Sequence, residues 1–107
     1  MQEANVIQSL SALAHEARLR VFRALVVAGS EGLTPSSLAQ QLGIAPNSLS
    51  FHLKELSHAQ LVSQERQGRS VLYRAAIPVM NELLAYLAEN CCQGAACTPE
   101  VSALCPC

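Results

Sequence analysis

Over the first quarter of the chain, apolar residues recur every three or four positions. This is the period of an amphipathic helix. The pattern predicts a first helix over residues 3–14 and a second over 16–27, with a loop at 30–33. Gly29 is expected to end the second helix in a left-handed conformation, which glycine adopts readily.

Two shorter apolar patterns follow, and each begins at a helix start signal. Thr34 offers a capping hydroxyl directly before Pro35, so a short helix is predicted to run from Pro35 to Gly43. Pro46 opens the next helix. Its expected buried stripe is formed by Leu49, Leu53 and Leu56. Two short helices joined by a glycine-containing turn make a helix-turn-helix.

From residue 61 the pattern changes period. Strand-like runs over residues 61–66 and 69–74 flank a turn expected at 67–68, which predicts a β-hairpin. Arg66 and Arg69 are placed at its tip. A hairpin that follows a helix-turn-helix and presents arginines is the wing of a winged helix.

Pro78 opens the last helical pattern, which is predicted to run to about Asn90. Glycine and prolines interrupt the sequence beyond it, so the remaining residues are expected to form a tail. We therefore predict a mainly α fold with a small β-hairpin, a winged helix-turn-helix domain over residues 1–90 and a cysteine-rich tail over 91–107.

Composition narrows the class of protein. A chain of 107 residues with no tryptophan and only four Tyr or Phe builds one core, mainly from aliphatic residues. Such a small domain buries a modest share of its surface, which favours a dimer. We find no signal peptide and no apolar run long enough to span a membrane, so the protein is expected to be cytosolic, with no membrane partner.

The net charge of −1 gives no general support for nucleic-acid binding. Between residues 44 and 74, however, four basic residues face two acidic ones, a local balance of +2. The second helix of the helix-turn-helix combines its apolar stripe with short polar side chains, as a helix that reads the major groove requires. The candidate DNA-binding residues on this helix and the wing are Asn47, Ser48, Ser50, Phe51, His52, Lys54, Arg66 and Arg69. The alternative is an ordinary solvated helix face.

The chain resembles the ArsR/SmtB family of metal-sensing repressors over residues 38–56 and 68–74. The opening motif Leu13-Ala14-His15-Glu16-Ala17-Arg18-Leu19-Arg20-Val21 is also similar to the early pattern of that family. The resemblance covers about residues 6–87. It implies a homodimer whose first and last helices pack across the two-fold axis, bound to operator DNA until an effector releases it. Phe51 departs from the commoner polar residue before the histidine, which would alter base preference or place the ring against the DNA backbone.

Ligand sites differ among members of this family, and several are missing from this chain. The helix at residues 35–42 lacks the Cys-x-Cys of the best-known arsenic site. The last helix has Glu82 and Glu89 but no histidine, which disfavours the family's zinc site there. No cysteine precedes Cys91, so an N-terminal cysteine site for cadmium or lead is excluded.

All five cysteines lie between Cys91 and Cys107. In a reducing cytosol, such a cluster favours metal binding or redox sensing over structural disulfides. Trivalent arsenic and antimony are soft ions that take three thiolates, and Cys91, Cys92 and Cys97 are the candidate ligands. The tail cysteines Cys105 and Cys107 could add further sulfurs but are not expected to be essential.

The sequence therefore predicts a repressor that binds operator DNA as a homodimer and is released by trivalent arsenic or antimony, with no tightly bound cofactor. Several alternatives stay open: a thiol-based redox sensor, a sensor of organoarsenicals or cadmium, and a metal-storing module. The cluster could also be a set of free thiols. An enzyme is disfavoured, because no nucleophile lies in a motif with a plausible base.

Overall fold

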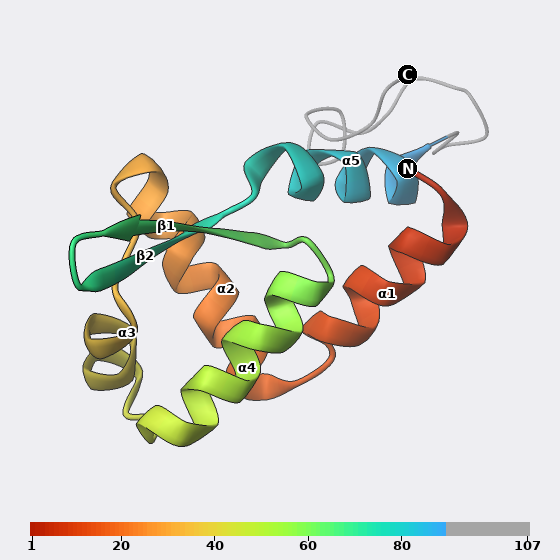
Figure 1. Cartoon of the computed structure of the whole chain (residues 1–107). Helices are drawn as coiled ribbons and strands as arrows, with labels where there is room; N and C mark the ends of the chain where they lie inside the picture. The colour runs from red at the N-terminus through yellow and green to blue at the C-terminus, as the bar shows by residue number, and fades with distance from the viewer. Residues whose placement is uncertain (90–107) are drawn as a thin grey trace.

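The computed structural model describes residues 1–89. Helices dominate this part of the chain, and its one antiparallel hairpin lies between the fourth and fifth α-helices (Figure 1). The elements are α1 (Glu3–Leu13), α2 (Glu16–Ala28), the 3₁₀ turn η1 (Gly29–Glu31), α3 (Pro35–Leu42), α4 (Pro46–His58), β1 (Val62–Gln67), β2 (Ser70–Ala75) and α5 (Ile77–Ala88). The predicted mainly α winged helix-turn-helix is confirmed.

The helix boundaries follow the local start and stop signals. The Thr34 hydroxyl accepts a hydrogen bond from the Ser37 backbone N–H at 3.2 Å, and Pro35 occupies the first turn of α3. Gly43 ends α3 in the left-handed region with φ +66° and ψ +35°. Pro46 lies in the first turn of α4. Local capping chemistry therefore sets the helix-turn-helix.

Two turns differ from the prediction. Gly29 has a positive φ of +64° but a ψ of −142°, so it is not a left-handed cap, and η1 occupies part of the expected loop. The hairpin turn falls on Gly68 and Arg69 rather than on 67–68, because Gln67 pairs with Ser70. A positive φ at the first of two turn residues suits glycine, and Gly68 has a φ of +61°.

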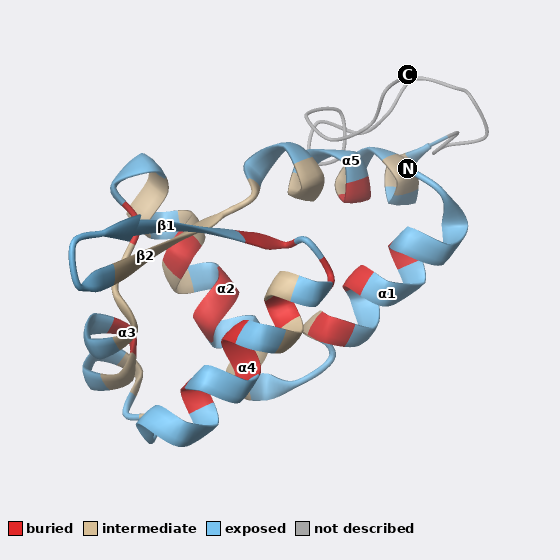
Figure 2. Ribbon diagram, in the orientation of Figure 1, coloured by how far each residue is buried: buried red, intermediate tan, exposed pale blue. Residues whose placement is uncertain are grey.

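The core lies where α2, α4 and the start of β1 meet, which Figure 2 shows as red bands on these elements. The stripe predicted for α4 is confirmed, since Leu49, Leu53 and Leu56 are at most 2% exposed. They pack in one cluster with Phe22 and Leu25 of α2. Burial of aliphatic and aromatic side chains of this size stabilises a domain by about 1.5–3 kcal/mol each. The buried face of α4 is therefore anchored to the core.

The molecule has two distinct ends (Figure 1). Helices α1 and α5 lie together at one end, and the hairpin tip and α3 lie at the other. The hairpin is tied to the helical body by a two-way backbone bridge, in which Leu33 and Tyr73 each donate an N–H to the other's carbonyl at 2.9 Å. None of the described helices is long and apolar enough to cross a lipid bilayer.

Candidate nucleic-acid interface

Most of the polar residues predicted to read DNA lie on the outer face of α4. This face is exposed and carries Asn47, Ser48, Ser50 and Lys54, while the leucine stripe of the same helix is buried. An anchored helix with short hydrogen-bonding side chains on its free face has the properties needed to enter a major groove. The structure therefore presents these four predicted residues together on one element.

His52 does not face outward as predicted. Its side chain is only 9% exposed, and its Nδ1 accepts a hydrogen bond from Nε of Arg18 at 3.3 Å. The ring also lies 4.7 Å from that of His15, centroid to centroid. The predicted outward orientation is wrong because position 52 belongs to the buried stripe, three residues after Leu49. A role of His52 in DNA binding stays a prediction.

The surroundings of His52 favour its neutral form. Burial lowers the pKa of His52 below its usual range, and the neighbouring His15 and Arg18 lower it further. A neutral ring whose Nδ1 accepts from Arg18 carries its proton on Nε2. His52 thus joins α4 to the start of α2 through an uncharged acceptor.

Arg18 is a contributor to this site that the sequence pattern did not reveal. Besides its bond to His52, its guanidinium carbon lies 5.5 Å from the centroid of the Phe51 ring, which is within the range of a cation–π contact. Arg18 and His52 are 34 residues apart in sequence. Since no local pattern reports a contact over that separation, only the fold brings these side chains together.

The wing presents its arginines as expected. Arg69 lies in the turn and Arg66 in the last part of β1, and both are exposed. Their place on a hairpin beside a helix-turn-helix suits contact with the DNA backbone or a neighbouring minor groove.

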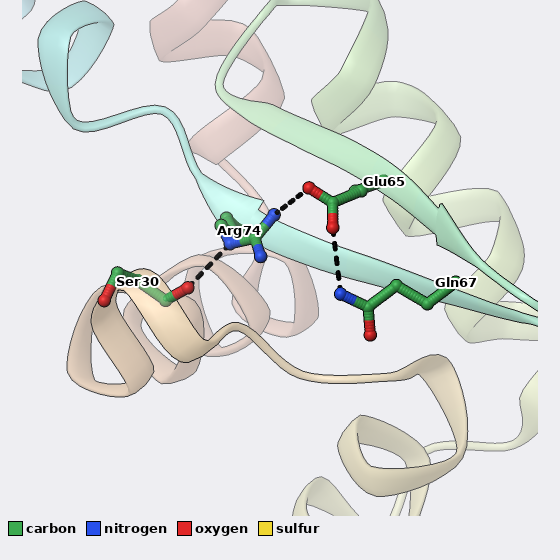
Figure 3. A network of polar contacts seen from close by, with 4 residues as sticks. All are labelled: Ser30, Glu65, Gln67 and Arg74. Carbon is green, nitrogen blue, oxygen red and sulfur yellow. Dashed lines mark hydrogen bonds and ion pairs between the residues drawn. The ribbon is translucent and has the colours of Figure 1, made fainter.

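The acidic residue of the wing is paired within the hairpin itself (Figure 3). Glu65 lies 3.3 Å from Nη1 of Arg74 and accepts a hydrogen bond from Nε2 of Gln67 at 2.8 Å. The bond from Gln67 and the charge of Arg74 lower the pKa of Glu65. Nε of Arg74 also donates to the Ser30 carbonyl at 2.7 Å. Because the charges of Glu65 and Arg74 offset each other, the net charge of the hairpin tip is positive and comes from Arg66 and Arg69.

The predicted effector ligands, Cys91, Cys92 and Cys97, lie outside the described residues, as does the whole predicted tail over 91–107. Within residues 1–89, no group of three or more His, Cys, Asp or Glu side chains is placed to hold a metal ion. The described part of the chain therefore offers no competing metal centre of that kind.

Comparisons with known proteins agree with this geometry. A family model described as a helix-turn-helix domain matches residues 13–65. The nodulation protein NolR of Rhizobium meliloti is 30% identical over 80 residues, which are 75% of this chain and 63% of NolR.

Solved structures show the same architecture. An ArsR-like transcriptional regulator from Rhodococcus sp. RHA1 superposes with a TM-score of 0.67 at 29% identity, over 75% of this chain and 73% of that one. The antimony-specific transcriptional repressor AntR superposes with a TM-score of 0.63 at 31% identity, over 75% of this chain and 71% of AntR.

Proposed function

This chain belongs to the ArsR/SmtB family of winged helix-turn-helix transcriptional regulators, and on that premise we propose that it is an operator-binding homodimeric repressor released by trivalent arsenic or antimony. The observation that carries the DNA-binding part is the division of α4 into two faces. The leucine stripe of this helix is at most 2% exposed. The opposite face is exposed to solvent and carries Asn47, Ser48, Ser50 and Lys54.

The wing supports the same proposal through its charge. Arg66 and Arg69 are exposed near the hairpin tip, and the carboxylate of Glu65 is already paired with Arg74. Arginines at such a tip would contact phosphates, which supply affinity and fix the register of the protein on the duplex. Base reading would then fall to α4.

The opposite end of the molecule supports dimer formation. Ile7 and Leu10 of α1 and Leu87 of α5 are 41–56% exposed. Next to them, an apolar groove of about 360 Å³ runs between α2 and α5, lined by residues that include Leu19 and Met80. Large exposed apolar side chains gathered at one end of a small domain indicate a protein interface. We propose that a second copy covers this end, leaving both α4 helices free.

The effector part of the proposal depends on the chemistry of the cysteines. Cys91, Cys92 and Cys97 supply three sulfurs within seven residues, which matches the three-thiolate preference of trivalent arsenic and antimony. AntR, similar to this chain in fold, is described as antimony-specific. Residues 1–89 contain no cysteine at all, so every thiolate would come from the tail.

The described contacts suggest how ligand binding beyond α5 would reach the DNA-reading helix. The backbone N–H of Ala76, at the start of α5, donates to the Leu61 carbonyl at 2.8 Å. Leu61 in turn donates to the Leu56 carbonyl, at the end of α4, at 3.0 Å. A shift of α5 in the dimer interface would thus be passed to the end of α4 through Leu61. An effector weakens DNA binding only if it favours the conformation with lower DNA affinity.

The test is a titration of operator-bound protein with arsenite and antimonite, followed by fluorescence anisotropy of labelled DNA. Wild type is expected to release the DNA, whereas Cys91→Ser, Cys92→Ser and Cys97→Ser variants should bind DNA normally and stay bound. Cys105→Ser serves as the matched cysteine control and should respond like wild type. Arg69→Gln is the converse control, because it should weaken DNA binding but keep the response.

Three results would contradict the proposal. If the purified protein binds no duplex from its own promoter region, the repressor assignment fails. If Cys91→Ser and Cys92→Ser variants respond normally to arsenite, the proposed ligands are wrong. If DNA is released by peroxide with loss of free thiols but not by arsenite or antimonite, the protein is a redox sensor instead.

A further inference from the structure

Phe51 is an apolar side chain on an otherwise polar surface. Its ring is 53% exposed on α4, among the exposed residues Asn47, Ser48, Ser50 and Lys54. The exposed apolar residues of α1 and α5 lie at the other end of the molecule, where the proposed dimer would cover them. Phe51 lies on the solvent-exposed face of α4, so the proposed dimer interface does not account for its exposure.

The ring of Phe51 packs against two neighbouring side chains. Arg18 lies 5.5 Å from its centroid, and the His52 ring meets it nearly edge-on at 5.9 Å with an interplanar angle of 67°. Arg18 is itself oriented by its hydrogen bond to His52. A ring supported in this way loses little conformational entropy when it contacts a ligand.

The major groove has one apolar feature on its base edges, the C5-methyl group of thymine. We propose that Phe51 reads a thymine methyl in each operator half-site, with Arg18 and His52 as the positioning residues that fix its ring. This inference rests on the proposed function, because it requires α4 to enter the major groove. The neighbouring Asn47, Ser48 and Ser50 would supply the polar base contacts around this apolar one.

The proposal makes a prediction about single atoms of the DNA. Replacing the contacted thymine by uracil removes only the methyl group and leaves base pairing unchanged. Burying one such carbon group is worth about fourfold in affinity. Replacing that thymine by cytosine changes the hydrogen-bonding pattern as well, and 5-methylcytosine at the same position should then recover the part of the affinity that depends on the methyl.

The experiment first selects operator duplexes from a random-sequence pool with the full-length wild-type protein. Each thymine of the selected half-site is then replaced by uracil, and binding is measured by fluorescence anisotropy at one fixed salt concentration. One thymine per half-site should show a loss of about fourfold. A Phe51→Gln variant should bind thymine and uracil duplexes equally at that position.

Lys54→Met is the matched control on the same helix face. It should weaken binding to thymine and uracil duplexes by the same factor, because loss of a phosphate contact does not depend on the base. The wild-type uracil series requires no variant, so a folding defect of Phe51→Gln could not hide the result. Circular dichroism of that variant checks its helix content.

Two outcomes overturn the inference alone. In one, wild type binds selected duplexes but no thymine position is sensitive to loss of its methyl, which would place the ring against the sugar-phosphate backbone. In the other, Phe51→Gln keeps the full thymine preference, which would assign the methyl contact to a different side chain. A wild-type protein that selects no duplex overturns the proposed function and this inference with it.

Discussion

Two arginines each join an element of the proposed DNA interface to the rest of the domain, and the two contacts differ in burial and charge. Arg18 on α2 reaches α4 through the buried, neutral ring of His52 and the face of Phe51. Arg74 on β2 reaches a carbonyl of η1 and the exposed carboxylate of Glu65. The first contact is partly buried, and the second is largely open to solvent.

The exposed ion pair between Arg74 and Glu65 contributes little to the position of the wing. Exposed ion pairs contribute about 0–1 kcal/mol. The wing is instead positioned by the backbone bridge between Leu33 and Tyr73 and by the close approach of Gly32 to β2. At the junction of α2 and α4, the leucine stripe carries the stability, and Arg18 orients the side chains above it.

Replacing Gly32 by alanine gives the largest expected effect. Gly32 has a φ of +68° and a ψ of −176°, and an added Cβ would lie 2.5 Å from the Tyr73 carbonyl oxygen. Because backbone strain and a backbone clash combine, Gly32→Ala should lower the free energy of unfolding by about 3 kcal/mol. Urea unfolding followed by circular dichroism measures this loss.

Gly43→Ala is the control for that measurement. Gly43 has a φ of +66°, but nothing lies within 4 Å of the added Cβ. It should therefore lose only the strain of the left-handed conformation, about 1 kcal/mol. Equal losses for the two variants would show that the contact with β2 contributes nothing and that the wing is held elsewhere.

Removing the side-chain contact of either arginine should lower the free energy of unfolding by less than Gly32→Ala does, and by unequal amounts. Arg18→Met removes a partly buried hydrogen bond to a neutral acceptor and should lower the free energy of unfolding by about 1 kcal/mol. Glu65→Gln removes the negative charge of an exposed ion pair and one of the two acceptor oxygens, and it should cost less stability than Arg18→Met. Urea titrations of both variants and wild type, at low salt and in 1 M NaCl, measure the two losses.

Salt sharpens the distinction between the two arginines. The contribution of Glu65 should disappear in 1 M NaCl, because surface charges are screened. The contribution of Arg18 should persist, since His52 is neutral. If both contributions vanish at high salt, the Arg18 contact is electrostatic in the same way as the hairpin pair.

Much of the fold could be predicted because its signals are local. The capping residue Thr34, the prolines Pro35 and Pro46, and the glycine Gly43 set the helix-turn-helix within a few residues. The period of two after residue 61 identified the hairpin. Its turn was misplaced by one residue, although a two-residue turn that begins with glycine would have indicated Gly68 and Arg69.

The interior of the site could be predicted less well. The burial of His52 was readable in principle, because it lies at the i+3 position of the leucine stripe, but its polarity suggested the DNA-facing side. The contact of Arg18 with His52 and the approach of Gly32 to Tyr73 join residues distant in sequence. Such contacts depend on how the helices pack, which no local pattern encodes.

The smallest predicted effect is a dependence of stability on pH that comes from His52. Because its pKa is lower in the folded protein than in the unfolded chain, the unfolded chain takes up a proton first as the pH falls. Stability from this group should be complete above about pH 6.5 and should be lost as the pH falls below that value. Protonation would also remove the acceptor used by Arg18.

The matched variant is His52→Asn, whose side-chain oxygen can replace Nδ1 as an acceptor but does not titrate. The urea midpoint should fall more between pH 7.5 and pH 5.5 for wild type than for His52→Asn. If the two proteins lose the same stability, His52 is not the responsive group. A smaller loss in the variant would mean that acid weakens the contact between α2 and α4 through His52. The side-chain contacts of the hairpin among residues 1–89 involve no histidine, so this pH dependence should not come from the wing.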